Sequence, residues 1–276
     1  MNVLHRWVIA GVAATVVAAG TVLAVQRSAT DPRTTGAAPS TPALVVTQVE
    51  SNAGVTPTTT TRAAQSGGAA ATGLNGGAAY ASLRPATRPV DTRTGKQRGT
   101  PFTVNGIAVV SAKHRVGASF KPKVVGTYPL ARVAAKAFAT MSAAVRRAHL
   151  RLTVVSGYRS HASQAALRRH ALAAYGRAYT DRYVAKPGTS EHQTGLAVDL
   201  RSPTGRGSTF DKTREWRWLR AHAQDYGFVL RYPKGLTRIT GIGFEPWHWR
   251  YVGVPQAKAI RALGANATIE QYLRLA

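Results

Sequence analysis

The sequence predicts an α+β fold for the carboxy-terminal part of the chain, and two observations support this prediction. From about Pro101 onward, apolar residues recur at helical spacing in some segments and form short β-like runs in others, with turn residues between them. These segments do not follow the regular alternation of strands and helices that is typical of a parallel sheet. We therefore expect one compact domain with a small, mainly antiparallel sheet and flanking helices.

The first expected helix carries an apolar stripe, and the polar Arg146 and Arg147 lie off that stripe. The stripe consists of Leu130, Val133, Ala137, Met141 and Val145. Ser160 is a suitable amino-terminal cap for a second helix that runs to about Tyr175.

Four strands are expected, over residues 152–155, 195–200, 228–232 and 247–252. Asp199 stands near the end of the second of these strands. A third helix is expected to begin at Asp211 and to end at Gly227, because glycine commonly follows the last turn of a helix. Short helices close the chain.

The composition limits the chemistry that the chain can carry. Its 276 residues, 44% of them hydrophobic, suffice for one core together with segments that need not fold. Cysteine is absent, which excludes disulfides, thiolate metal sites and a cysteine nucleophile. Any metal must therefore be bound by histidine and carboxylate side chains.

The formal charge of +26 favours association with polyanions. Arginine is scattered along the chain and forms no basic run with interleaved aromatic residues, so we do not expect nucleic-acid binding. Anionic wall polymers and anionic lipid head groups are an equally good physical match for this charge. We expect the protein to be a monomer.

Residues 1–27 predict a membrane anchor or a signal segment. Nineteen uncharged residues run from Trp7 to Val25, which is long enough to span a bilayer, and Arg6 precedes them. The basic flank favours a cytoplasmic amino terminus and an exported remainder. Small residues around Ala24 leave open that the segment is cleaved there and the protein secreted.

Residues 28–100 are predicted to be a low-complexity tether, because they are mostly threonine, alanine, glycine, proline and serine. Such a segment can hold a domain well away from a membrane surface. The catalytic domain is then expected over residues 101–276.

Two of the eight histidines stand out from the others. His192 lies in a loop that leads into the strand with Asp199, and small residues there allow close packing of the backbone. His248 follows Glu245 by three residues at the start of a strand. The remaining histidines have no carboxylate at a recurrent ligand spacing, and we assign them no metal.

A catalytic zinc ion takes three protein ligands, which histidine and carboxylate side chains can supply, and keeps one open position. His192, Asp199 and His248 supply that number of ligands for one zinc ion. Glu245, which is not used for the metal, is then the expected general base. Arg159 lies on a strand-to-helix loop from which it could stabilise an oxyanion, although the residues alone leave open that it is an ordinary surface arginine.

Three blocks of the sequence resemble the VanY-type D-alanyl-D-alanine carboxypeptidases, which are zinc peptidases of peptidoglycan. The blocks are residues 156–164, which read SGYRSHASQ, residues 190–199, which read SEHQTGLAVD, and residues 227–253, which contain EPWHWRYVG. The resemblance covers about Thr103 to Gly253. It implies a zinc-peptidase fold and the same three metal ligands, with Glu245 as base and Arg159 at the oxyanion.

The resemblance also implies a set of residues that line the substrate cleft. These are Gln164, Ser190 and Tyr232, with Trp247 packed beside the metal. The residues themselves leave simpler roles open: a loop-capping hydroxyl for Ser190, and core burial for Tyr232 and Trp247.

The expected reaction is removal of a carboxy-terminal D-alanine from peptidoglycan stem peptides. Enzymes with L,D specificity and endopeptidases that act on cross-links use a similar scaffold, so both remain alternatives. A wall-binding module without activity is the alternative from a different class. The presence of Glu245 argues against that alternative, because a binding module does not need a general base.

Overall fold

The computed structural model describes residues 83–276 of the chain. The expected membrane segment, and the expected tether up to residue 82, lie outside these residues. No helix within residues 83–276 is long and apolar enough to cross a membrane.

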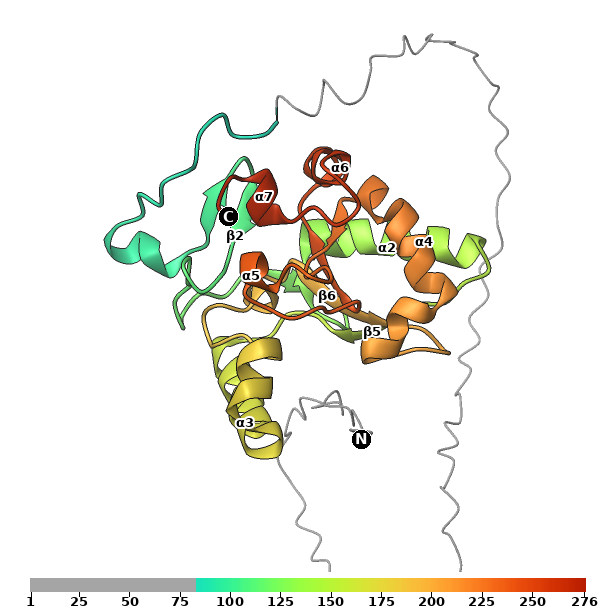
Figure 1. Cartoon of the computed structure of the whole chain (residues 1–276), viewed down its shortest axis with the longest axis horizontal. Coiled ribbons are helices and arrows are strands. Elements are labelled where there is room, and N and C mark those ends of the chain that lie inside the picture. The colour runs from blue at the N-terminus through green and yellow to red at the C-terminus, as the bar shows by residue number, and fades with distance from the viewer. Residues whose placement is uncertain (1–82) are drawn as a thin grey trace, which may run out of the picture. The chain divides into compact units, whose positions relative to one another are not determined.

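A four-stranded antiparallel sheet forms the centre of the domain (Figure 1). Its spatial order is β5 (Thr153–Ser156), β6 (Ala197–Arg201), β8 (His248–Tyr251) and β7 (Phe228–Leu230). Each strand begins within two residues of the start that the sequence predicts, because the runs are rich in β-branched and aromatic residues. The α+β prediction with a small antiparallel sheet is confirmed.

Helices and two small hairpins surround this sheet. The longer helices are α2 (Arg132–Arg147), α3 (His161–Tyr183), α4 (Arg214–His222) and α6 (Val254–Ala262), and the short ones are α5 (Thr237–Thr240) and α7 (Ile269–Tyr272). The hairpins consist of β1 (Phe102–Val104) with β2 (Ile107–Val109) and of β3 (Val124–Val125) with β4 (Leu130–Ala131). Short 3-10 helices cover Gly95–Gly99, Glu191–Thr194, Gly207–Lys212 and Ala223–Tyr226.

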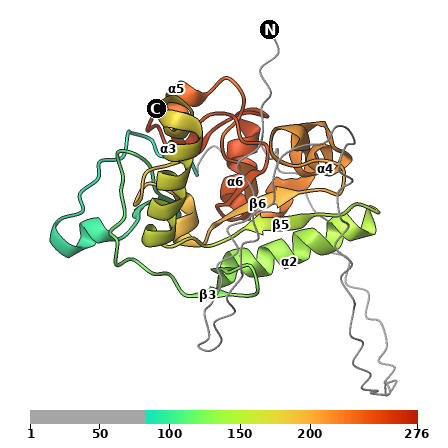
Figure 2. The same ribbon diagram turned by 90° about the horizontal axis from the view of Figure 1, so that it is seen from below.

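The two faces of the sheet have different partners, because side chains alternate along each strand. Val198 and Leu200 of β6 and Trp249 of β8 pack into a core with Met141 of α2 and Leu219 of α4. The alternate residues of β6 and β8 point to the opposite face. Figure 2 shows α2 on one side of the sheet and α6 on the other. The functional side chains described below lie on the face away from α2.

A second core joins the two ends of the described chain. Phe102 and Ile107 of the first hairpin pack with Ile260 of α6 and with Ile269 and Tyr272 of α7. The carboxyl end accordingly lies beside β2 in Figure 1.

The residues upstream of Pro101 join the same contacts. Leu83 packs against the second core, and the guanidinium group of Arg84 donates hydrogen bonds to the carbonyl groups of Gln271 and Tyr272. The described fold therefore begins before residue 101, within the segment that composition assigns to the tether.

The helices differ from the sequence prediction at three points. Val133 is 58% exposed, and Ala134 occupies the core position instead, because Leu130 belongs to β4 and not to the helical stripe. Element α3 consists of two helical segments, because Gly176 at φ +73° and ψ 176° is not helical; the first segment ends at about Tyr175, as the sequence predicts, and a second segment that was not expected continues to Tyr183. Thr213 caps α4 through a 3.2 Å hydrogen bond from the Trp216 amide, so the prediction that Asp211 begins this helix is wrong.

Candidate metal centre

The sheet register brings Asp199 and His248 together. These residues are direct cross-strand partners in the β6–β8 ladder, and so their side chains emerge side by side on the same face. Both are buried, with 6% and 4% exposure. Residues 49 positions apart in sequence are thus adjacent because of strand pairing alone.

His192 reaches the same place from the single-turn helix Glu191–Thr194. Gly195 ends this turn at φ +69°, and a Cβ atom there would lie 2.9 Å from the amide nitrogen of Ala131. A glycine is therefore required for the chain to turn sharply into β6. The short loop holds His192 against the strand that carries Asp199.

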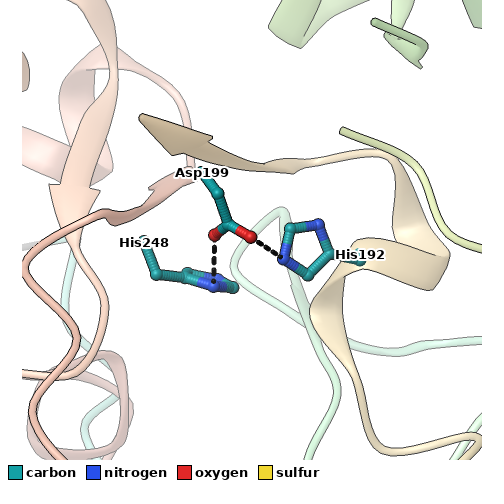
Figure 3. Close-up of side chains that lie close together, drawn as sticks. All are labelled: His192, Asp199 and His248. Atoms are coloured by element: carbon teal, nitrogen blue, oxygen red, sulfur yellow. Dashed lines mark ion pairs between the residues drawn. The ribbon is translucent and has the colours of Figure 1, made fainter. Parts of the chain in front are cut away.

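The carboxylate of Asp199 lies between the two imidazole rings (Figure 3). Its Oδ2 atom is 3.2 Å from Nε2 of His192, and its Oδ1 atom is 3.2 Å from Nδ1 of His248. One potential ligand atom from each of the three residues lies within 4.8 Å of the others. The structure therefore assembles the three residues that the sequence predicts as metal ligands.

The chemistry of this donor set fits a zinc ion, which accepts imidazole nitrogen and carboxylate oxygen. Nδ1 of His192 lies 2.6 Å from the carbonyl oxygen of Gly157, so it carries the proton and leaves Nε2 free as a ligand. Oδ1 of Asp199 is buried without a well-formed hydrogen bond in the described part of the chain. A cation at this point would supply the missing partner.

The electrostatics keep Asp199 ionised. Burial alone would raise the pKa of its carboxyl group, but the charges and hydrogen bonds of His192 and His248 outweigh burial and hold the pKa far below its usual range. Burial lowers the pKa of His192. The site thus presents an ionised carboxylate between two histidine rings.

Glu245 borders the three residues. Its Oε2 atom lies 3.5 Å from Nδ1 of His248, and its amide nitrogen donates a 3.2 Å hydrogen bond to the carbonyl of Tyr232. Burial, together with the nearby charge of Asp199, raises the pKa of Glu245 to about 8 although His248 opposes the shift. Two carboxyl groups in one pocket therefore differ widely in proton affinity.

Arg159 lies at the edge of the same pocket. Its guanidinium group is 3.7 Å from Asp199, and it donates hydrogen bonds of 2.8 Å to Oε1 of Gln164 and 3.1 Å to the hydroxyl of Ser156. The amide of Arg159 also donates to the carbonyl of His192. Arg159 is consequently held in the site by several contacts and is not an ordinary surface arginine.

The expected cleft residues have different positions. Gln164 is 2% exposed and donates to the carbonyl of Ala185, so it orients Arg159 in addition to any contact with substrate. The ring of Tyr232 lies 4.9 Å from that of His248. Ser190 is buried immediately before the single-turn helix, and Trp247 packs at the edge of the core on the α2 side.

Comparison with known proteins agrees with this geometry. The family model for VanY, D-alanyl-D-alanine carboxypeptidase, matches residues 128–254. A D-alanyl-D-alanine carboxypeptidase of Enterococcus faecalis is 40% identical over 129 residues, which cover 44% of this chain and 46% of that protein. The chain thus spans about half the length of this curated relative.

Solved structures extend the comparison to the fold. The LD-carboxypeptidase LdcB is similar with a TM-score of 0.55 and 33% identity, over 61% of this chain and 85% of that one. A Zn(II) complex of the vancomycin-resistance D,D-pentapeptidase VanY has a TM-score of 0.53 and 30% identity, over 59% of this chain and 96% of that one. This chain belongs to the VanY family. The family resemblance expected from the three sequence blocks is therefore confirmed.

Membership of the VanY family accounts for the blocks around His192 and His248, but it does not account for the whole described fold. The first hairpin and α7 lie outside residues 128–254. Glu191, next to His192, was not predicted to have a role, although it is a buried carboxylate within 3.6 Å of His248. Its burial was not evident from the sequence, where it stands in a polar loop.

Proposed function

We propose that this protein is a zinc-dependent D,D-carboxypeptidase that removes the terminal D-alanine from peptidoglycan stem peptides. The observation that carries the proposal is the convergence of His192, Asp199 and His248 in one buried pocket with Glu245 beside them. A VanY structure in complex with D-alanine-D-alanine, 30% identical to this chain, supports the choice of substrate.

His192 through Nε2, Asp199 through its carboxylate and His248 through Nδ1 would hold the zinc ion. When bound, zinc supplies Lewis acidity, which polarises a carbonyl group and acidifies a nearby water molecule. The Gly157 carbonyl accepts the Nδ1 proton of His192 and so turns Nε2 of this ring toward Asp199.

Glu245 has the position and proton affinity of a general base. It accepts the proton of the water that attacks the scissile carbonyl and then delivers it to the nitrogen of the departing D-alanine. Burial raises the pKa of Glu245, and so its ionised form is a stronger base than an exposed carboxylate. Asp199, which stays ionised, is unsuited to this role.

Arg159 provides the positive charge for the oxygen that becomes anionic during the attack. Its guanidinium group is fixed by Gln164 and Ser156 before substrate arrives, so little reorganisation is needed. The same planar group is also suited to a substrate carboxylate, because arginine binds carboxylates through paired hydrogen bonds.

An L,D-carboxypeptidase is the second candidate. The similarity to LdcB, described as an LD-carboxypeptidase, is as strong as that to VanY. The two activities differ in the residue that precedes the terminal D-alanine, and therefore a direct substrate comparison separates them.

We further propose that the domain acts outside the cytoplasmic membrane. The apolar stretch from Trp7 to Val25 would anchor or export the chain, and residues 28–82 would provide reach into the wall. The charge of +26 favours contact with anionic wall polymers or lipid head groups during this search.

The activity can be tested with the full chain in a mild detergent. The protein is loaded with zinc and incubated with a pentapeptide stem that ends in D-Ala-D-Ala, with a tetrapeptide stem that ends in an L,D bond, and with cross-linked stems. Mass spectrometry should detect D-alanine from the pentapeptide, and a chelator should abolish its release. Release from the tetrapeptide alone would establish L,D specificity, and no product from any substrate would refute peptidase function.

A further inference from the structure

A buried network of four charged side chains lies directly behind His248, on the side away from Asp199. Its members are Glu191 at 1%, Arg231 at 2%, Arg250 at 0% and Glu270 at 7% exposure. Two carboxylates balance two guanidinium groups, which is the condition under which charges are tolerated in a protein interior. None of the four takes part in the proton transfers described above.

Glu191 connects this network to the metal centre. Its Oε1 atom is 2.7 Å from Nε of Arg231 and 2.6 Å from Nη1 of Arg250. Its Oε2 atom is 3.6 Å from Nε2 of His248. The same residue directly precedes His192, so Glu191 adjoins one expected ligand in the chain and another in space.

The two nitrogens of His248 face opposite groups. Nδ1 lies 3.2 Å from Asp199 and 3.5 Å from Glu245, on the side of the metal site, whereas Nε2 faces Glu191. Within residues 83–276, neither Nε2 of His248 nor Oε2 of Glu191 makes a hydrogen bond that meets the usual geometry. Each atom is therefore available as a partner for the other. Ligation through Nδ1 requires the proton on Nε2, and a carboxylate at that nitrogen holds it there.

The other end of the network reaches segments outside the region matched by the family model. Arg231 makes a paired interaction with Glu270 of α7, with hydrogen bonds of 3.0 and 2.5 Å. Arg250 donates to the carbonyl of Ala108 in β2. Helix α7 and the first hairpin thereby fix the positions of the two guanidinium groups, and these groups in turn pair with Glu191.

We propose that Glu191 is a positioning residue that sets the tautomer and ring orientation of His248, and that Glu270 supports it through Arg231. Metal affinity then depends on a helix that contains no metal ligand. The inference rests on the proposed metal site. The test measures zinc affinity and not peptidase activity. A protein that binds zinc but releases no D-alanine would therefore contradict the proposed function without contradicting this inference.

The primary test is zinc affinity of the full chain with Glu191→Gln, measured by competition with a chromophoric chelator. Glutamine has nearly the same shape but no charge, so it should weaken zinc binding about 10- to 100-fold, as is typical for loss of an outer partner of a ligating histidine. The visible absorption spectrum of the Co²⁺-loaded variant should also change. Asp225→Asn is the matched control, because Asp225 pairs with Lys258 at the surface and should leave both measurements unchanged.

Glu270→Gln tests the connection to α7 and keeps the proposal falsifiable if Glu191→Gln does not fold. This variant should weaken zinc binding in the same direction by a smaller factor. A folded Glu191→Gln protein with wild-type zinc affinity and an unchanged Co²⁺ spectrum would overturn the proposal. Wild-type zinc affinity in Glu270→Gln would overturn the role assigned to Glu270.

Discussion

At the scale of single residues, the candidate centre separates two buried carboxyl groups by their surroundings. Asp199 lies between two imidazole rings that stabilise its anion, whereas at Glu245 burial and the nearby carboxylates outweigh the charges of His248 and Arg159. When the environments of two titratable groups shift their pKa values in opposite directions, the two groups commonly have different roles in acid–base chemistry. The geometry therefore favours Asp199 as ligand and Glu245 as base.

Glu245→Gln should retain zinc but lose turnover about 10²- to 10⁴-fold, because the amide cannot accept the proton of the attacking water. Release of D-alanine under saturating substrate, alongside the zinc content of the purified protein, measures both effects. Asp199→Asn is the comparison and should lose zinc instead. Wild-type turnover in Glu245→Gln would mean that another group is the base.

At the scale of elements, the loop after β5 supports several parts of the site at once. The carbonyl of Gly157 accepts a hydrogen bond from His192, and the neighbouring amide of Tyr158 donates a 2.6 Å hydrogen bond to the carbonyl of Pro129, immediately before β4. A Cβ atom at Gly157 would lie only 2.5 Å from that Pro129 oxygen. The loop can approach β4 this closely because residue 157 has no side chain.

Gly157→Ala should displace this loop and so disturb both His192 and Arg159. We expect a loss of about 1–3 kcal/mol in the free energy of unfolding, which is typical of a forced steric contact, together with weaker zinc binding. Urea unfolding and chelator competition measure these effects. Gly99→Ala is the matched control, since its added Cβ would meet nothing within 4 Å. Equal results for the two variants would contradict the role of the close approach.

At the scale of the whole described molecule, the two ends of the domain stabilise each other. The ring of Tyr272 in α7 is 1% exposed, and its hydroxyl donates a 2.6 Å hydrogen bond to the carbonyl of Leu83. Arg274 donates to the carbonyl of Pro85 in the same region. The residues that precede the first hairpin therefore help to fix α7, the helix that carries Glu270.

Tyr272→Phe should lower the free energy of unfolding by about 1 kcal/mol, because it removes one hydrogen bond and keeps the packing. Tyr272→Ala should cost about 3–5 kcal/mol, since it also leaves a cavity. Chemical denaturation of the full chain checks both values. Tyr128→Phe, at a residue that is 49% exposed, should have no measurable effect. A Tyr272→Ala protein as stable as the wild type would show that the two ends contribute little.

The sequence by itself determined which residues can carry the chemistry. The absence of cysteine restricts metal ligands to histidine and carboxylate, and the motifs place His192 in a loop before one strand and His248 at the start of another. The α+β class, the four strands and the capping role of Ser160 followed from local periodicity and local hydrogen bonding. Such features depend on neighbouring residues, which is why they can be predicted from a single chain.

Only the tertiary structure decided how these residues meet. Strand register makes Asp199 the direct partner of His248, and the packing of α2 on the sheet buries Ala134 and leaves Val133 exposed. The pairing of Glu191 with Arg231, and of Arg231 with Glu270, joins segments with no shared local pattern. Long-range packing selects such partners, because burial makes an unpaired charge costly wherever its partner lies in the sequence.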